Sequence, residues 1–316
     1  MGNQLITPVT TKATSLFSGN GISAGISGMQ GFRKDMEDTH IATTIPNFED
    51  HTIFAVFDGH CGDATAKYAE KHFVETLAKS PEWLTYIATQ SADHLMYALT
   101  NCFIRLDSAM RINPDILASG CTAVVVIVAP RIIVCANAGD SRAIMSQIGD
   151  KNAIALSEDH KPENPAETAR ITQNGGFVQN NRVNGTLAVS RGLGDFDLKQ
   201  NPQQPLVSCL PDFVVRHRNY EQDEFILVAC DGLWDVYKNN EAIEELRAIV
   251  KEGERDICLI AEEMLDMSLQ RGSNDNISAI VVKLSSFPYT ESGGAGVAER
   301  RAARQRDSNR SSDDSS

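Results

Sequence analysis

The chain has 316 residues, of which 42% are hydrophobic and 22% are charged, a composition typical of a folded globular protein. Its formal net charge is −13, which argues against a surface built to bind nucleic acid or an anionic membrane. No apolar stretch approaches the roughly 18 residues of a membrane helix, and the 7 cysteines form no CxxC pair. We therefore predict a reduced, cytoplasmic protein, with the nucleus and the membrane surface as alternative locations.

Residues 1–20 are rich in Ser, Thr, Asn and Gly and are expected to form a flexible N-terminal segment. After residue 20, the pattern of hydrophobic residues alternates between stretches typical of strands and stretches typical of helices. Strands are predicted within 21–58 and at 121–128, 131–137, 142–147, 152–156, 206–216, 224–230 and 277–284. Helices are predicted at 62–79, 92–111, 164–175, 239–251 and 256–270. Residues 176–205 are rich in Gly, Asn and Gln and are expected to form loops over a site.

From residue 286 the composition changes to Gly, Ala, Ser, Arg and Asp. Such a segment cannot bury enough apolar surface to fold alone, so a disordered tail is predicted for 286–316. One folded domain is therefore expected over residues 21–285, between the N-terminal segment and this tail.

Three aspartates stand where the sequence predicts the ends of buried strands. Asp58 follows IFAVF, Asp140 follows IIVCANAG and Asp231 follows FILVAC. An ionised carboxylate beside a buried strand costs free energy unless positive charge neutralises it. Each Asp adjoins a Gly, so each could be an ordinary turn residue. Three such strand ends together favour one acidic pocket that binds metal cations.

More carboxylates lie at neighbouring element boundaries. Glu37 and Asp38 close the sequence RKDMED, Asp235 follows Asp231 by four residues, and Asp275 precedes the last predicted strand. Oxygen-only ligands select Mg²⁺ or Mn²⁺, or Ca²⁺ in a larger cage. Zinc is disfavoured because the sequence has no HExxH motif and no Cys/His cluster.

Two further residues could act on a phosphoryl group beside such a pocket. Arg33 opens RKDMED, and Arg is suited to bidentate capture of a phosphate. His60 follows Asp58 by two residues and could donate a proton or bind metal. Alone, either could be an ordinary surface or turn residue. The pattern GISAG matches a GxSxG nucleophile elbow only by letter, since it lacks the strand and helix that the elbow requires.

The motifs of the whole chain resemble those of the metal-dependent protein phosphatases (PPM family, type 2C). Nine occur in the family's order: RKDMED, FAVFDGHCGD, SGCTAVVV, NAGDSR, SEDHKP, AVSRGLGDFD, PDFVV, ACDGLWDV and SNDNISAIVV. The resemblance spans about residues 22–285. It implies an α+β fold, a two-sheet antiparallel β-sandwich flanked by helix pairs, with a site for two Mg²⁺ or Mn²⁺ ions at one end.

The resemblance also implies a role for each acidic residue. Asp58 matches the carboxylate that bridges both metals, and Gly59 matches a carbonyl ligand. Glu37, Asp231 and Asp275 match the remaining ligand positions, and Asp38 matches a carboxylate that holds metal-bound water. Asp140 and Asp235 match a weaker third-metal site. Arg33 matches the phosphate-binding arginine and His60 the proposed general acid.

A phosphoserine/phosphothreonine phosphatase is therefore predicted, in which a metal-activated water attacks phosphorus in line. A catalytically silent phosphatase-fold module that binds or regulates phosphoproteins is the alternative. A two-metal phosphodiesterase or nuclease is disfavoured by the net charge of −13. Phosphorylated proteins are the expected partners of a monomer. Membrane contact is expected only if Gly2 is N-myristoylated, and Ile6 stands where that signal prefers Ser or Thr.

Overall fold

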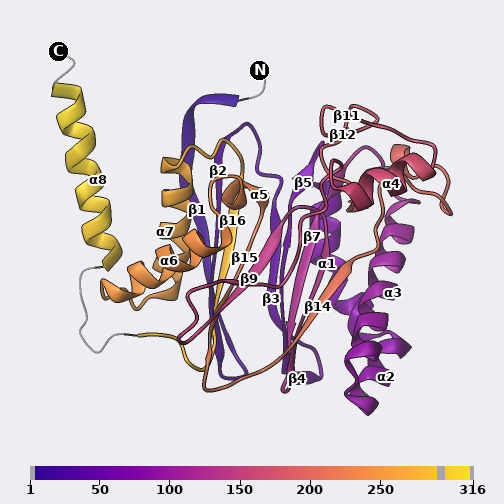
Figure 1. Cartoon of the computed structure of the whole chain (residues 1–316), viewed down its shortest axis with the longest axis horizontal. Helices are drawn as coiled ribbons and strands as arrows, with labels where there is room; N and C mark the ends of the chain where they lie inside the picture. Colours follow the sequence, from indigo (N-terminus) through magenta and orange to yellow (C-terminus); the bar gives the residue numbers. More distant parts are fainter. Residues whose placement is uncertain (1–3, 290–295, 314–316) are drawn as a thin grey trace.

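Two antiparallel sheets pack face to face, with helices on both outer faces (Figure 1). The computed structural model describes residues 4–289 and 296–313. The six-stranded sheet has the order β1 (Gln4–Gly19), β2 (Ile22–Arg33), β16 (Ile277–Lys283), β15 (Asp223–Ala229), β9 (Arg142–Gln147) and β10 (Ile154–Ala155). The five-stranded sheet has the order β14 (Asp212–His217), β8 (Ile132–Ala138), β7 (Ala123–Val128), β4 (Phe48–Phe57) and β3 (Thr39–Ile45). The predicted α+β sandwich is confirmed.

Helices cover each sheet, and smaller elements gather at one end of the sandwich (Figure 1). The five-stranded sheet is covered by α1 (Ala64–Ala78), α2 (Pro81–Thr89) and α3 (Ala92–Met110). The six-stranded sheet is covered by α5 (Asp231–Trp234), α6 (Asn239–Lys251) and α7 (Ile257–Gln270). The smaller elements are β13 (Leu193–Gly194), β6 (Gly120–Cys121) and β5 (Gly59–His60), the hairpin β11 (Val178–Gln179) and β12 (Arg182–Val183), α4 (Pro165–Gln173) and the 3-10 helix η1 (Phe196–Leu198).

The central strands are apolar throughout because both of their faces are buried. In β4, Phe54 and Val56 belong to the core between the two sheets. Ile53, Ala55 and Phe57 alternate with them and pack against the helices instead. A strand with two buried faces has no polar face to reveal its period of two, so it reads as a continuous apolar run. The helices therefore exclude water from the second face of each sheet.

Strand register brings several chain segments together at one end of the strands of the six-stranded sheet. Ala229 near the end of β15 pairs with Ala279 of β16. Ile277 at the start of β16 pairs in turn with Met29 near the end of β2. Because all these pairs are antiparallel, the residues that follow β2 and β15 lie beside those that precede β16. The acidic residues predicted to bind metal converge at this end of the sandwich.

Two segments that were expected to lack structure contain regular elements. The N-terminal segment forms the edge strand β1, whose register with β2 runs from Gln4 opposite Arg33 to Gly19 opposite Ile22. The tail expected to be disordered contains α8 (Gly296–Asp313), on the outer side of α6 and α7 (Figure 1). Gly2 lies outside the described residues. Among the described residues, no helix is both long and apolar enough to cross a membrane.

Ion pairs hold most of α8 in place, with one apolar residue, Val297, buried in the core over the six-stranded sheet. Arg300 Nη1 lies 2.5 Å from Glu245 Oε1 of α6, and Arg301 pairs with Glu262 of α7 at 2.7 Å. Arg304 donates to both oxygens of Glu263, whose side chain is 0% exposed. Composition alone predicts disorder because this helix carries little hydrophobic surface. Its order depends on acidic partners that lie far away in sequence.

The pairing of Arg304 with a buried carboxylate yields a stability prediction. Arg304→Ala leaves Glu263 without its principal cation and should lower the free energy of unfolding by about 1–2 kcal/mol, since Arg304 is itself partly exposed. The matched control is Arg306→Ala on the same helix, where the side chain is exposed. Urea unfolding measures both variants. Equal stability of the Arg304 and Arg306 variants would contradict a stabilising role for the Arg304–Glu263 ion pair.

Candidate active site

Three aspartates from three strand ends converge at the acidic end of the sandwich. Asp58 follows β4, Asp140 lies two residues after β8, and Asp231 begins α5 one residue after Cys230. One carboxylate oxygen from each of the three lies within 4.8 Å of the others. Backbone hydrogen bonds fix the first of these positions, since Thr122 N donates to Asp58 O at 2.9 Å. The three aspartates that the sequence places at strand ends therefore form one cluster.

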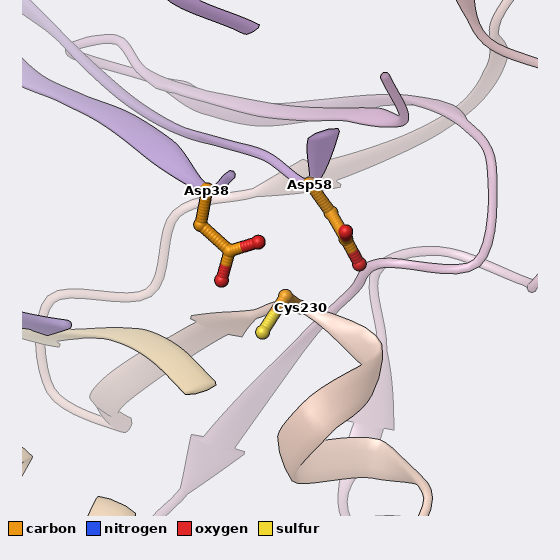
Figure 2. A group of neighbouring side chains, drawn as sticks. All are labelled: Asp38, Asp58 and Cys230. Atoms are coloured by element: carbon orange, nitrogen blue, oxygen red, sulfur yellow. The ribbon is translucent and has the colours of Figure 1, made fainter. Parts of the chain in front are cut away.

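Asp58 also belongs to a second cluster, with Asp38 and Cys230. Figure 2 shows their side chains arranged around one space, each on a different segment of the chain. Asp38 is only 8% exposed. Within the described part of the chain, neither of its carboxylate oxygens has a hydrogen-bond partner. Buried carboxylate oxygens are normally satisfied, so this pair of oxygens fits a bound cation or an ordered water.

The clustered carboxylates raise one another's pKa. Removal from water is the largest cause for Asp58 and Asp231, and repulsion from neighbouring aspartates adds to it, so both pKa values lie well above the usual range. Burial raises the pKa of Asp38 to about 6. The pKa values of Asp140 and Asp275 are raised as well, again mainly by burial. Holding all five ionised at neutral pH requires compensating positive charge.

Two side-chain cations contact this cluster directly. Lys161 Nζ lies 3.3 Å from Asp140 Oδ2. Arg33 forms a salt bridge with Asp275. Two cations leave the five aspartates with an excess of negative charge. Hard divalent cations with oxygen ligands fit this donor set.

Asn276 fixes the segment that carries Glu37 to the acidic end of the sandwich. The Asn276 side chain accepts from Glu37 N at 2.9 Å and donates to the carbonyls of Gln30 and Asp35. The Glu37 carboxylate accepts from Gly62 N at 2.6 Å. Sequence reasoning missed Asn276, although it follows Asp275 directly. Its function depends on three backbone partners more than 200 positions away.

Backbone packing explains the glycine between Asp58 and His60. A Cβ atom on Gly59 would lie 2.4 Å from the carbonyl oxygen of Glu37. A side chain at this position would therefore push the Glu37 segment away from Asp58. The close approach holds two of the predicted ligand segments together.

Asp235 and Asp275 lie at the margin of the cluster. Asp235 is the C-cap residue that follows α5, is exposed, and acts on Asp231 and Lys161 electrostatically. Asp275 faces the cavity but is engaged by Arg33. Neither residue belongs to the two tight clusters described above. The structure thus separates an inner set, which contains Asp38, Asp58, Asp140 and Asp231, from an outer set.

A cavity of about 280 Å³ opens over the inner aspartates. Arg33 and His60 line it together with Asp58, Asp140, Asp231 and Asp275. Another part of the lining comes from Arg182 in β12 and from residues Thr186–Val189. The loops expected over a site within 176–205 therefore do line this cavity. Arg182 adds a second guanidinium to its wall, which sequence reasoning did not single out.

His60 has one well-defined partner that the sequence argument did not assign. Its Nε2 donates to Asp195 Oδ1 at 2.7 Å, because an ionised carboxylate can only accept. Burial of the imidazole lowers its pKa, but the hydrogen bond and charge of Asp195 outweigh this effect. The pKa of His60 is therefore raised. Asp195 lies in the motif AVSRGLGDFD, which offered no spacing signal toward His60.

Comparison with known proteins identifies the family. The family model of protein phosphatase 2C matches residues 22–277, so the chain belongs to that family. It is 39% identical over 308 residues to Protein phosphatase ppm-1.A of Caenorhabditis elegans, covering 91% of this chain and 64% of that protein. It is 38% identical over 303 residues to Protein phosphatase 1B of Bos taurus, covering 91% and 62% respectively. The chain thus spans less than two thirds of the length of these two relatives.

A solved structure supports the same assignment. The fold matches a serine-threonine phosphatase 2C from Toxoplasma gondii with a TM-score of 0.74 and 26% sequence identity. The match covers 87% of this chain and 99% of that one. The sandwich and the acidic end described above thus occur on a phosphatase 2C fold.

The raised pKa of Asp38 predicts how stability depends on pH without metal. The folded protein holds this proton up to about pH 6, whereas the unfolded chain releases it near the ordinary aspartate pKa of 3.8. The contribution to stability therefore falls as pH rises through this window. Asp38→Asn removes the charge, so the metal-free variant should exceed wild type by on the order of 2 kcal/mol at pH 7.

This difference in unfolding free energy should be much smaller at pH 4 and should vanish below about pH 3, where the carboxyl is neutral in both states. Urea unfolding in the presence of a chelator measures it. The exposed-site control Asp115→Asn should show no such dependence on pH. If the variant and wild type differed in unfolding free energy by the same amount at pH 4 and pH 7, the raised pKa assigned to Asp38 would be contradicted.

Proposed function

We propose that this chain hydrolyses phosphoserine and phosphothreonine in proteins, with two Mg²⁺ or Mn²⁺ ions held by the clustered carboxylates. The observation that supports this most is the convergence of Asp58, Asp140 and Asp231 in a cavity that Arg33 and His60 also line. Divalent ions bound there would lower the pKa of a coordinated water and offset phosphoryl charge. Membership of the phosphatase 2C family supports the same reaction.

Asp58 is the proposed bridge between the two ions. It is the residue shared by both tight clusters, one with Asp38 and one with Asp140 and Asp231. A carboxylate at the junction of two oxygen-rich sites can present one oxygen to each. The outer residues Glu37 and Asp275 and the Gly59 carbonyl are the proposed remaining ligands. Asp38 is the proposed acceptor for a coordinated water.

Asp140 and Asp235 are proposed to form a weaker third site. Their arrangement fits a looser site, since Lys161 already neutralises part of the Asp140 charge and Asp235 is exposed. A cation there must compete with the lysine ammonium and with water. The expected affinity is therefore lower than at Asp58 and Asp231.

Arg33 is proposed to bind the phosphoryl group of the substrate. Its side chain is 45% exposed, lines the cavity, and is held toward the acidic end by Asp275. A guanidinium has five N–H donors, so the salt bridge leaves donors for phosphate oxygens. Arg33 would orient the phosphoryl group above the carboxylates.

His60 is proposed to protonate the departing serine or threonine oxygen. It lines the cavity beside the aspartates, and the carboxylate of Asp195 raises its pKa, which favours the protonated ring more than in an ordinary histidine. An alkoxide is a poor leaving group, so proton donation at this atom lowers the barrier. The reaction then requires no covalent intermediate on the protein.

A catalytically silent phosphoprotein-binding module is the alternative function. It would need the fold and Arg33 but not the buried carboxylates. The free energy cost of burying Asp38 without a partner is hard to explain if no cation is ever bound. Neutral or small residues would serve a binding module better at these positions. A cytoplasmic, monomeric protein remains our expectation.

Removal of the proposed bridge tests the metal centre. Asp58→Asn should lower Mn²⁺-dependent hydrolysis of a phosphothreonine peptide by at least about 100-fold, because both ions lose a shared ligand. Phosphate release is measured with and without Mn²⁺. Asp115→Asn, an exposed change of the same kind, should retain full activity. Substantial Mn²⁺-dependent turnover by the Asp58 variant would contradict the bridge.

Removal of the proposed acid should depend on the leaving group. His60→Ala should slow a phosphothreonine peptide by about 10²–10⁴-fold. It should slow 4-nitrophenyl phosphate much less, because nitrophenolate leaves without protonation. Turnover of both substrates at saturating Mn²⁺ gives the comparison. Equal losses on both substrates would refute proton donation by His60.

A further inference from the structure

A short three-stranded sheet, β13–β6–β5, brings Asp195 to His60. In the register of this sheet, His60 of β5 and Gly194 of β13 both pair with Gly120 of the central strand β6. Asp195 follows Gly194 directly. The two side chains therefore meet across a single glycine although 135 positions separate them, and the Nε2–Oδ1 distance is 2.7 Å.

Gly120 is the position that makes this meeting possible. A Cβ atom added there would lie 2.2 Å from Asp195 Oδ2 and 2.4 Å from His60 Nε2. Both contacts are far inside van der Waals distance, so any side chain at 120 would displace the ring or the carboxylate. The backbone φ of Gly120 is not unusual, and the need for glycine here comes from the space that the two side chains occupy.

Asp195 is held rigidly by its own surroundings. Its backbone has the left-handed conformation, with φ 53°, and its N–H donates to Ser119 O at 3.1 Å. The preceding Gly194 N donates to Asp107 Oδ1 of α3 at 2.9 Å. Lys199 Nζ donates to the same oxygen at 2.6 Å, and both side chains of this ion pair are nearly inaccessible. A non-glycine residue in this conformation persists only where its surroundings hold it.

We propose that Asp195 is a positioning residue that fixes the orientation and tautomer of the His60 ring. This role rests on the proposed function, because it matters only if His60 acts in the cavity. The hydrogen bond places the ring proton on Nε2 and leaves Nδ1 as the nitrogen available to the cavity. The imidazole cannot rotate without breaking this bond. Gly120 and the Asp107–Lys199 pair support the arrangement from behind.

Asp195→Asn tests the proposal, since Asn tolerates the left-handed conformation and keeps the shape of the side chain. We expect kcat for a phosphothreonine peptide to fall at least about tenfold, with KM within about twofold. The loss on 4-nitrophenyl phosphate should be smaller. Asp197→Asn, an exposed change of the same charge two residues away, should match wild type on both substrates. Unchanged kcat, or equal losses on both substrates, would overturn the proposal.

A second measurement is independent of activity. Two-bond ¹H–¹⁵N NMR correlations of the neutral His60 ring should show the proton on Nε2 in wild type, with and without Mg²⁺. Asp195→Asn should change this pattern, and Asp197→Asn should preserve it. Wild type with the proton on Nδ1, or an unaltered pattern in the Asp195 variant, would overturn the proposal. Because this readout needs no turnover, it tests the pair even if the proposed phosphatase activity fails.

Discussion

The structure depends on one electrostatic constraint, the placement of several carboxylates where two sheets exclude water. Asp38, Asp58, Asp140 and Asp231 lie close enough for burial and mutual repulsion to raise their pKa values. A protein of net charge −13 does not gain stability from such a cluster. Divalent cations would turn this cost into binding free energy. The fold surrounding the cluster serves mainly to hold these carboxylates in place.

Each structural level contributes to that placement. The apolar strands β4 and β8 run in the same direction because each pairs antiparallel with β7, and the acidic cluster joins their ends to the residue that begins α5 after β15 in the other sheet. Asn276, the residue that follows Asp275, holds the segment that carries Glu37 through a hydrogen bond from Glu37 N. The loop from Arg182 onward forms another part of the cavity lining. Acidic side chains and the basic side chains of Arg33, His60 and Arg182 therefore line the same cavity.

Much of this arrangement could be predicted from the sequence, because the signals are local. An apolar run that ends in an aspartate predicts a strand and the acidic residue at its end together, as at Asp58 and Asp231. Contacts between residues far apart in the chain left no such local pattern in the sequence. The pairing of His60 with Asp195 depends on a sheet of two-residue strands, and Asn276 acts through backbone groups. The helix α8 escaped prediction because its partners Glu245 and Glu263 belong to other helices.

Proton release on metal binding tests the central claim most directly. Calorimetric titration of Mn²⁺ into the metal-free protein at pH 6, in buffers of different ionisation enthalpy, counts the protons that leave. If the buried carboxylates carry raised pKa values and bind the metal, Mn²⁺ must displace protons from them. The account predicts release of at least about one proton per chain, and much less from Asp58→Asn. Tight Mn²⁺ binding without proton release would contradict it.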